Sequence, residues 1–520
     1  MTLLEERSEQ SLPPRADPVA VAIRLRPRES RGIEQRFGPS DPPRGWDVAR
    51  NPRIAKLLRS RKFQFFLILP NQLIFWLVIF VGLLGTVVPG LNFGTAITWY
   101  VWFCLVFVMM VVVGRAWCVM CPFGGFAEWV QRRSLWRRAQ HRLGLGRSLP
   151  EPIARYGFLL SVGSFLILTW IEEYFNIAGP GNPVATSLMV LGIVTSALTF
   201  FLLFDRRTFC RYICPLSAVI GTVGGIGSVA GFRTRDRQVC LSCNTKDCMR
   251  GGESGYGCPW YTWPGSADSN LSCGLCSECY KACPSDNIGL YLQKPLTSLV
   301  APTRRRSDVA WAISLLWGLV VFQQFNATNL YASLDSWLNR MTHFPQYPNP
   351  VDYLGIIALV AAATAGLAKV IELALGRRGA SGARPGTFLE RTSRFRSFFL
   401  PLMYGIVPVV GADYFARQLP KFLLHAPRVV PAVGHFFGAG STRSLLYHTS
   451  IATGSGIVAV QLAVVGVGTL AAMWTSWRIS GRELAPVATR PLVARLSAVG
   501  LAAGFGVLAS ILYVAMHAAQ

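Results

Sequence analysis

The chain has 520 residues, 52% of them hydrophobic, and a mean hydropathy of +0.37, values that exclude most soluble proteins of this length. Its formal net charge of +25 would suit a nucleic-acid-binding protein. The Lys and Arg residues lie between long apolar segments, however, as they do in membrane proteins. We therefore expect contact with membrane lipid and no nucleic-acid partner.

The N-terminal residues 1–62 are rich in Pro and Arg and contain no long apolar segment. This composition predicts a disordered basic tail and no signal peptide. The segment holds 14 Lys and Arg residues. Because positive charge is retained on the inner side of membranes, we expect the tail to be cytoplasmic.

Nine apolar segments are long enough to cross a bilayer as helices. They lie near residues 64–88, 96–117, 156–172, 184–204, 309–326, 352–372, 397–414, 451–476 and 492–515. Residues 131–155 hold seven Lys and Arg residues, whereas residues 90–98 hold none. This alternation predicts a mainly α, polytopic bundle of about nine spans in the bacterial inner membrane, with a four-span domain at 63–231 and a five-span domain at 307–520.

Two Cys-Pro units mark the ends of the second and fourth predicted spans. They read Cys118-x2-Cys121-Pro122 and Cys210-x3-Cys214-Pro215. The units are 93 residues apart and each follows a two-span hairpin, which indicates an internal duplication about an axis along the membrane normal. Each cysteine pair shares one helix face, and each proline removes a helical hydrogen bond, so both helices should break there.

The four cysteines of these units have three interpretations. They could bind a further metal centre, either iron–sulfur or copper, because soft thiolates select both. They could form a redox-active dithiol system. They could also be small buried residues that pack against a kinked helix, which is common for free cysteine.

Eight further cysteines lie within 44 residues, between the two membrane domains. The last four form Cys273-x2-Cys276-x2-Cys279-x3-Cys283-Pro284, and the first four form the longer run Cys240-x2-Cys243-x4-Cys248-x9-Cys258-Pro259. The last run has the spacing by which bacterial ferredoxins bind [4Fe–4S] clusters. The spacing therefore predicts an inserted cytoplasmic, two-cluster, ferredoxin-like α+β module over residues 232–306.

In two-cluster ferredoxins, the fourth cysteine of each run binds the other cluster. One cluster should then take Cys240, Cys243, Cys248 and Cys283, and the other should take Cys273, Cys276, Cys279 and Cys258. Cys-x2-Cys pairs can also bind zinc. The gaps of 2, 2 and 3 residues followed by proline are not the usual spacing of zinc ligands, however. Disulfides are not expected on the cytoplasmic side.

Together these elements resemble the membrane polyferredoxin family, which includes the nitrous-oxide reductase regulator and the quinol-oxidising membrane subunit of periplasmic nitrate reductase. The resemblance covers roughly residues 60–295. Family members usually carry Cys-x3-Cys-Pro twice, whereas the first copy here has the shorter gap between Cys118 and Cys121. The resemblance implies electron transfer between a quinol or cytoplasmic donor and a partner redox enzyme.

The first functional hypothesis is therefore a membrane-bound iron–sulfur electron-transfer component of an oxidoreductase system, with no catalytic residue of its own. The five C-terminal spans, which contain no cysteine, would provide a quinone site or a docking surface. The alternative is a membrane copper reductase or metalloenzyme assembly factor, because Met120 lies between two thiols and such ligands suit Cu(I). A transporter is disfavoured, since we find no charged residue in the middle of a predicted span.

Overall fold

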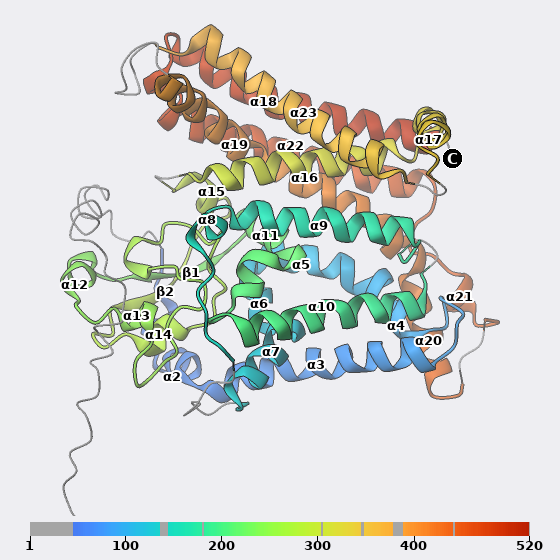
Figure 1. Cartoon of the computed structure of the whole chain (residues 1–520), viewed down its shortest axis with the longest axis horizontal. Helices are drawn as coiled ribbons and strands as arrows, with labels where there is room; N and C mark the ends of the chain where they lie inside the picture. Colours follow the sequence, from blue (N-terminus) through green and yellow to red (C-terminus); the bar gives the residue numbers. More distant parts are fainter. Residues whose placement is uncertain are drawn as a thin grey trace, which may run out of the picture.

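The computed structural model describes residues 45–135, 144–178, 181–302, 305–344, 348–377, 388–439 and 442–518. Within these ranges, nine helices are long and apolar enough to cross a membrane. They run roughly parallel across Figure 1, and the cysteine-rich module lies at one end of the bundle. The predicted mainly α, nine-span architecture is confirmed. We call the two ends of the bundle the module end and the far end.

The first four spans include one irregular helix. The regular spans are α3 (Arg61–Leu84), α9 (Gly157–Tyr174) and α10 (Pro183–Leu203), and the irregular one is built from α4 (Phe93–Thr95), η2 (Ala96–Trp102) and α5 (Phe103–Val113). The helix breaks at Gly114, whose φ of 61° is costly for any other residue. Three short helices follow, η3 (Gly114–Ala116), α6 (Trp117–Met120) and α7 (Pro122–Arg132).

The five C-terminal spans pack around two central helices. The spans are α16 (Ser307–Phe325), α18 (Pro350–Leu375), α19 (Phe388–His425), α22 (Ser455–Glu483) and α23 (Pro491–Ala518). Most of α16 and α19 is buried, because α16 contacts α9 on one side and α18, α19 and α23 on the other. The short helices α17 (Asn329–Thr342), α20 (Val429–Phe436) and α21 (Leu445–His448) lie at the far end (Figure 1).

The module is built on a two-stranded antiparallel sheet. Strands β1 (Ala230–Thr234) and β2 (Ile288–Leu292) pair with Phe232 opposite Leu290. Between them run α12 (Arg237–Ser242), α13 (Asp247–Arg250), η5 (Pro264–Ser266) and α14 (Glu278–Ala282). The predicted domain boundary at residues 231–232 therefore falls inside a strand, and the module begins slightly earlier in the chain.

A segment of the predicted disordered tail is folded against this sheet. It contains η1 (Val48–Arg50) and α2 (Pro52–Arg59). The buried Asp47 carboxylate accepts hydrogen bonds from the backbone N–H groups of Ala49 (3.0 Å) and Leu290 (3.1 Å) and from Arg235 Nε (2.9 Å). The prediction of disorder is thus wrong for residues 45–62, because one anchoring carboxylate outweighs the polar composition. Residues 1–44 lie outside the described ranges.

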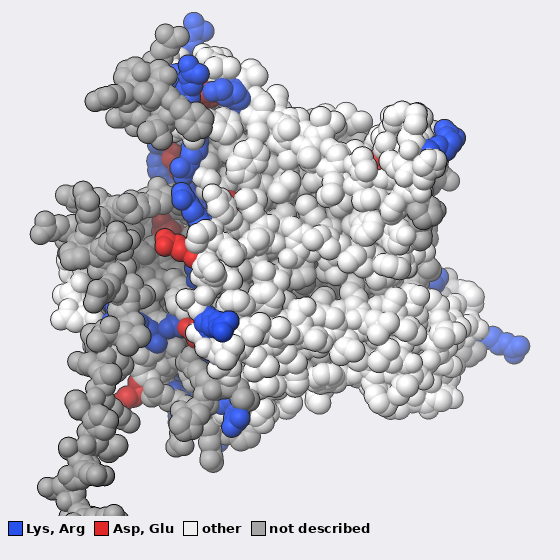
Figure 2. Space-filling view, viewed as in Figure 1, with Lys and Arg blue, Asp and Glu red and all other residues white. Residues whose placement is uncertain are grey.

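The surface has the pattern expected of a multi-pass membrane protein. In Figure 2, the described Lys and Arg residues gather mainly at the module end, with a few at the far end, and a broad band between them shows almost no charge. Phe66, Leu73 and Phe80, spaced by seven residues along α3, are 62–63% exposed. Such an apolar stripe is stable against lipid but would be unfavourable in water.

Candidate metal centres

The first predicted cysteine set gathers around one pocket. Cys240 lies in α12, Cys243 follows it, Cys248 lies in α13 and Cys283 follows α14, and all four line this pocket. Burial and the neighbouring thiols of Cys283, Cys240 and Cys243 raise the pKa of Cys248 to about 12. Four thiolates would repel one another at this site, so a bound cation is needed to hold them deprotonated. Their role as ligands stays a prediction that this arrangement supports.

The second predicted set is also brought together. Burial and then the thiols of Cys258, Cys276 and Cys273 raise the pKa of Cys279 well above its ordinary value. Cys258 belongs to the first run but lies close to Cys273 of the second run. Burial and Cys273 raise the pKa of Cys258 to about 11. The exchange of the fourth cysteine between runs, expected from the ferredoxin pattern, stays a prediction, which the position of Cys258 beside Cys273 and Cys279 supports.

The two Cys-Pro endings of the module are built alike. The backbone N–H of Thr262 donates to Cys258 Sγ, and the backbone N–H of Asn287 donates to Cys283 Sγ, both at 3.3 Å and both from four residues further along the chain. Hydrogen bonds to sulfur favour the thiolate and tune the potential of iron–sulfur clusters. Two equivalent endings support two equivalent sites.

The same likeness extends to the third cysteine of each run. Cys248 and Cys279 are each the second residue of a short helix, and the residues that precede these helices, Lys246 and Ser277, both have left-handed backbone conformations with φ of 52° and 59°. The two extra residues between Cys243 and Cys248 are therefore absorbed before the helix begins. The longer first run keeps the local geometry of the regular one, which its spacing did not reveal.

The Cys-Pro units in the membrane domain lie at helix breaks, as predicted. Cys121 and Cys214 have extended backbones (ψ of 124° and 121°), and the next residue of each starts a new helix, α7 or α11 (Pro215–Val223). The second unit does not end the fourth span, however. That span stops at Leu203, and Cys210 lies in a separate π-helical segment, η4 (Phe209–Ile213). A turn between the two segments is the reason for the difference.

The four membrane-domain thiols converge at one buried site. Burial and then the thiols of Cys121 and Cys118 raise the pKa of Cys214, and the same two thiols act on Cys210. A Cβ added to Gly124 of α7 would lie 3.2 Å from Cys210 Sγ, so the first repeat packs directly against the second. We call these four cysteines the membrane thiols.

Two buried arginines flank the membrane thiols. Arg207 donates from Nη1 to the carbonyl of Cys118 (2.7 Å) and from Nη2 to Glu128 Oε2 (2.5 Å). Arg115 donates to Ser217 Oγ (3.0 Å), and its guanidinium carbon lies 4.9 Å from the centre of the Trp260 ring. Their positive charge favours thiolates in a low-dielectric site. Sequence reasoning missed both residues, because two arginines among 51 Lys and Arg residues carry no distinguishing signal.

The three cysteine sets lie in a definite order. Cys248 of the first set helps to raise the pKa of Cys279 of the second set, and the two residues belong to one packed cluster. Cys258 of the second set packs in the same buried cluster as Cys118 and Cys210, and Cys210 and Cys276 both help Glu128 to raise the pKa of Arg207 against the effect of burial, so Arg207 lies close to both sets. The order is therefore first module set, second module set, membrane thiols.

The donor sets fit iron–sulfur clusters chemically. In the ranges that the structure describes, no group of three or more His, Cys, Asp or Glu side chains is arranged to hold one metal ion. A [4Fe–4S] cluster does not require that arrangement, because each of its four thiolates binds a different iron. Four cysteines per site, with sulfur atoms that accept hydrogen bonds, match this requirement.

Comparison with known proteins relates the membrane repeats to iron–sulfur proteins. The family described as "4Fe-4S binding domain" matches twice, at residues 95–141 and 186–230, so each match contains one Cys-Pro unit. The ferredoxin-type protein NapH of Escherichia coli (strain K12) is 33% identical over 140 residues, which are 25% of this chain and 44% of NapH. The chain thus spans less than half the length of that relative. No solved structure matches.

Proposed function

Since this chain is related to the membrane polyferredoxins, we propose that it is an iron–sulfur electron-transfer protein with a relay of three centres. The observation that carries the proposal is the order of the three cysteine sets, because Cys248 packs in one cluster with Cys279 of the second set, and Cys258 of the second set packs in one cluster with Cys118 and Cys210. [4Fe–4S] clusters, when bound, supply one-electron chemistry. The chain holds them through thiolates, excludes water with packed side chains and sets their separation.

Electrons are exchanged with the aqueous phase at the first module set. Cys243 and Cys283 are partly exposed, whereas the cysteines of the second set are mostly buried. Val239, which lines the same pocket, is 37% exposed and lies beside this entry point. A soluble redox partner can therefore approach the first set, and clusters held by the three cysteine sets would supply the one-electron chemistry between that partner and the bundle.

We place the N-terminus and the module on the cytoplasmic side of a bacterial inner membrane. The concentration of Lys and Arg at the module end supports this orientation (Figure 2). Thiols also stay reduced in the cytoplasm, which favours cluster assembly there. The electron partners would be a cytoplasmic redox protein at the module and a partner redox enzyme or the quinone pool at the bundle.

The alternative function, a copper reductase or metalloenzyme assembly factor, rests on Met120. Met120 lies between Cys118 and Cys121 in the sequence, and its side chain packs against the core cluster that contains Cys118 and Cys210. A thioether beside thiolates suits Cu(I). The match of an iron–sulfur family to these same residues favours iron over copper.

The experiment that tests the proposal is anaerobic purification followed by iron, sulfide, copper and zinc analysis and EPR of the reduced protein. Three clusters give about 12 iron atoms per chain, and two give about eight. Relative to the wild type, Cys276→Ser should lower the iron count by about four atoms per chain. The double variant Cys118→Ser, Cys214→Ser should separately lower the wild-type count by about four atoms. Cys104→Ser is the matched control, because Cys104 is buried in α5 outside the three sets. Zinc without iron would end the proposal.

A further inference from the structure

A row of polar side chains crosses the far half of the bundle, between α9, α16 and α19. We call it the polar seam, and its members are Glu172, Glu173, Gln323, Gln324, Asn326, Asp413, Arg417 and Lys421. The expectation that no charged residue lies in the middle of a span fails here, because α19 continues to His425, well beyond the predicted end at residue 414, and the fully buried Asp413 therefore lies inside the helix. One acid in a long apolar stretch scarcely changes its mean hydropathy. Ionisable groups inside a membrane are costly and mark functional pathways.

The seam is continuous from the surface inward. Asp413, Arg417 and Lys421 follow one another at four-residue intervals and so share a face of α19. At the far end, Lys421 Nζ lies 3.9 Å from Glu172 Oε1, and the two side chains are 29% and 18% exposed. Glu173 accepts a hydrogen bond from Asn326 Nδ2 at 3.1 Å.

The deep part of the seam contains polar atoms without partners. Asp413 Oδ1 accepts a hydrogen bond from Gln324 Nε2 at 2.5 Å. Among the described residues, Asp413 Oδ2, Gln323 Oε1, Gln324 Oε1 and Arg417 Nε are buried and have no hydrogen-bond partner. Each such atom costs about 1–3 kcal/mol if it stays dry. Four of them along one seam indicate a site for bound water, which satisfies several buried polar groups at once.

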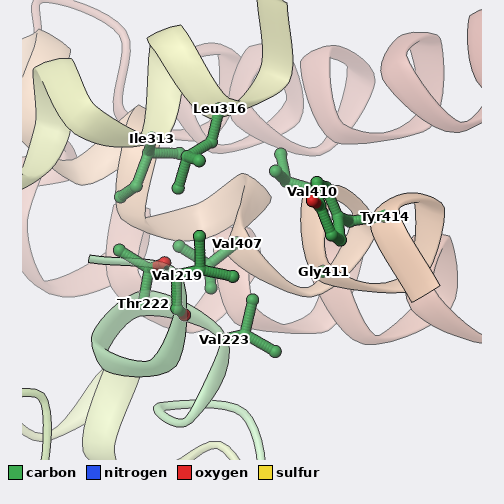
Figure 3. A pocket seen from close by; sticks show the side chains of 9 residues that line it. All are labelled: Val219, Thr222, Val223, Ile313, Leu316, Val407, Val410, Gly411 and Tyr414. Atoms are coloured by element: carbon green, nitrogen blue, oxygen red, sulfur yellow. Dashed lines mark hydrogen bonds between the residues drawn. The ribbon is translucent and has the colours of Figure 1, made fainter. Parts of the chain in front are cut away.

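Next to the deep end of the seam, Tyr414 follows Asp413 along α19 and lies beside the helix that follows the membrane thiols. Figure 3 shows Tyr414 at the edge of a narrow apolar pocket that Val219 and Thr222 of α11 line from the other side. Helix α11 starts directly after Cys214. The Tyr414 ring packs against Phe107, with a centroid separation of 4.8 Å. The seam therefore extends from the far end to Asp413, and its neighbour Tyr414 shares an apolar pocket with α11.

We propose that the polar seam is a hydrated proton path, open at the far end, that admits one proton for each electron accepted by the membrane thiols' centre. The electron adds negative charge in a low-dielectric interior, and a proton from far-side water that binds a seam carboxylate offsets that charge. The reductant loses one electron, the centre gains it, and the carboxylate becomes a carboxylic acid. The electron half rests on the proposed function, whereas the hydration of the seam stands by itself.

Radiolytic hydroxyl labelling of the full chain in lipid nanodiscs tests the hydration. Radicals form from bound water, so Tyr414, although only 4% exposed, should be oxidised at least about fivefold faster than Trp317, which is 1% exposed in α16. Gln323→Leu removes a polar contact and should slow the oxidation of Tyr414. Equal protection of Tyr414 and Trp317 would overturn the proposal, because it would mean a dry seam.

Proteoliposomes test the proton. Dithionite, an impermeant anion, is added outside and reduces only chains whose module faces outward, while a trapped dye reports the lumenal pH and EPR reports the reduced clusters. We expect the lumen to lose about one proton per reduced membrane centre. Glu173→Gln or Asp413→Asn should at least halve this loss, and Glu151→Gln, an exposed acid at the module end, should not change it.

The two possible failures can be told apart. Reduced clusters with an unchanged lumenal pH would refute the proton path and leave the electron relay intact. A preparation that contains no reducible cluster would refute the proposed function, and the labelling of Tyr414 would still decide whether the seam holds water.

Discussion

Arg207 sets the electrostatic environment of the membrane thiols, and its removal should lower the reduction potential there. A Cβ atom added to Gly124 would lie 3.7 Å from Arg207 Nη1 and 3.2 Å from Cys210 Sγ. The distance between Arg207 Nη1 and Cys210 Sγ is therefore at most 6.9 Å. At an effective dielectric constant of about 20, one charge at this distance contributes about 2.4 kcal/mol. For a one-electron couple that is about 100 mV.

Arg207→Gln should therefore lower the midpoint potential of the membrane centre by about 100 mV, because a positive charge stabilises the added electron. EPR-monitored redox titration measures the shift. Arg207→Lys keeps the charge and is the matched control. Glu128→Gln removes the opposite charge and should raise the potential. Arg207→Gln breaks the buried ion pair between Arg207 and Glu128, which costs about 3 kcal/mol, although Arg132 still pairs with the Glu128 carboxylate. The iron content of the variant is therefore measured before its potential.

A fully loaded Arg207→Gln protein whose potential equals that of the wild type would refute the reasoning. It would mean that solvent or compensating charge screens the site, and that burial of the guanidinium serves packing alone. A shift of the same size in Arg207→Lys would instead point to altered geometry rather than lost charge. The comparison of the two variants thus separates electrostatic from structural effects.

Three further predictions concern the scaffold. Asp47→Ala removes three hydrogen bonds and should cost about 3 kcal/mol, seen as earlier proteolysis of residues 45–60, whereas Asp47→Asn should cost less; equal resistance would contradict the anchoring role. Gly227→Ala would place a Cβ 1.1 Å from the carbonyl oxygen of Val111 and should lower Tm by several degrees or prevent folding, whereas Gly163→Ala, with nothing within 4 Å, should leave Tm unchanged. Tyr353→Phe removes a 2.8 Å hydrogen bond between α18 and α9 and should cost about 1 kcal/mol by thermal unfolding; no loss would show that water replaces it.

Local features of the chain determined the nine spans and predict the two module sets. Span length depends only on a run of apolar residues, and the structure has nine such helices in its described part. The cysteine runs could be paired from spacing because short loops bring neighbouring thiols together, and the ferredoxin pattern supplied the exchange of Cys258 and Cys283. The duplication was readable for the same reason, since each Cys-Pro unit is contiguous.

Tertiary packing alone decided how these pieces act together. The membrane thiols meet only because α7 packs against η4, and Arg207 lies close to two cysteine sets only because three separate segments fold around it. The anchoring of residues 45–59 and the polar seam depend in the same way on single polar side chains. Such residues hardly change composition or hydropathy, yet a buried charge or hydrogen bond between distant segments is worth several kcal/mol, so their role emerges only once the chain is folded.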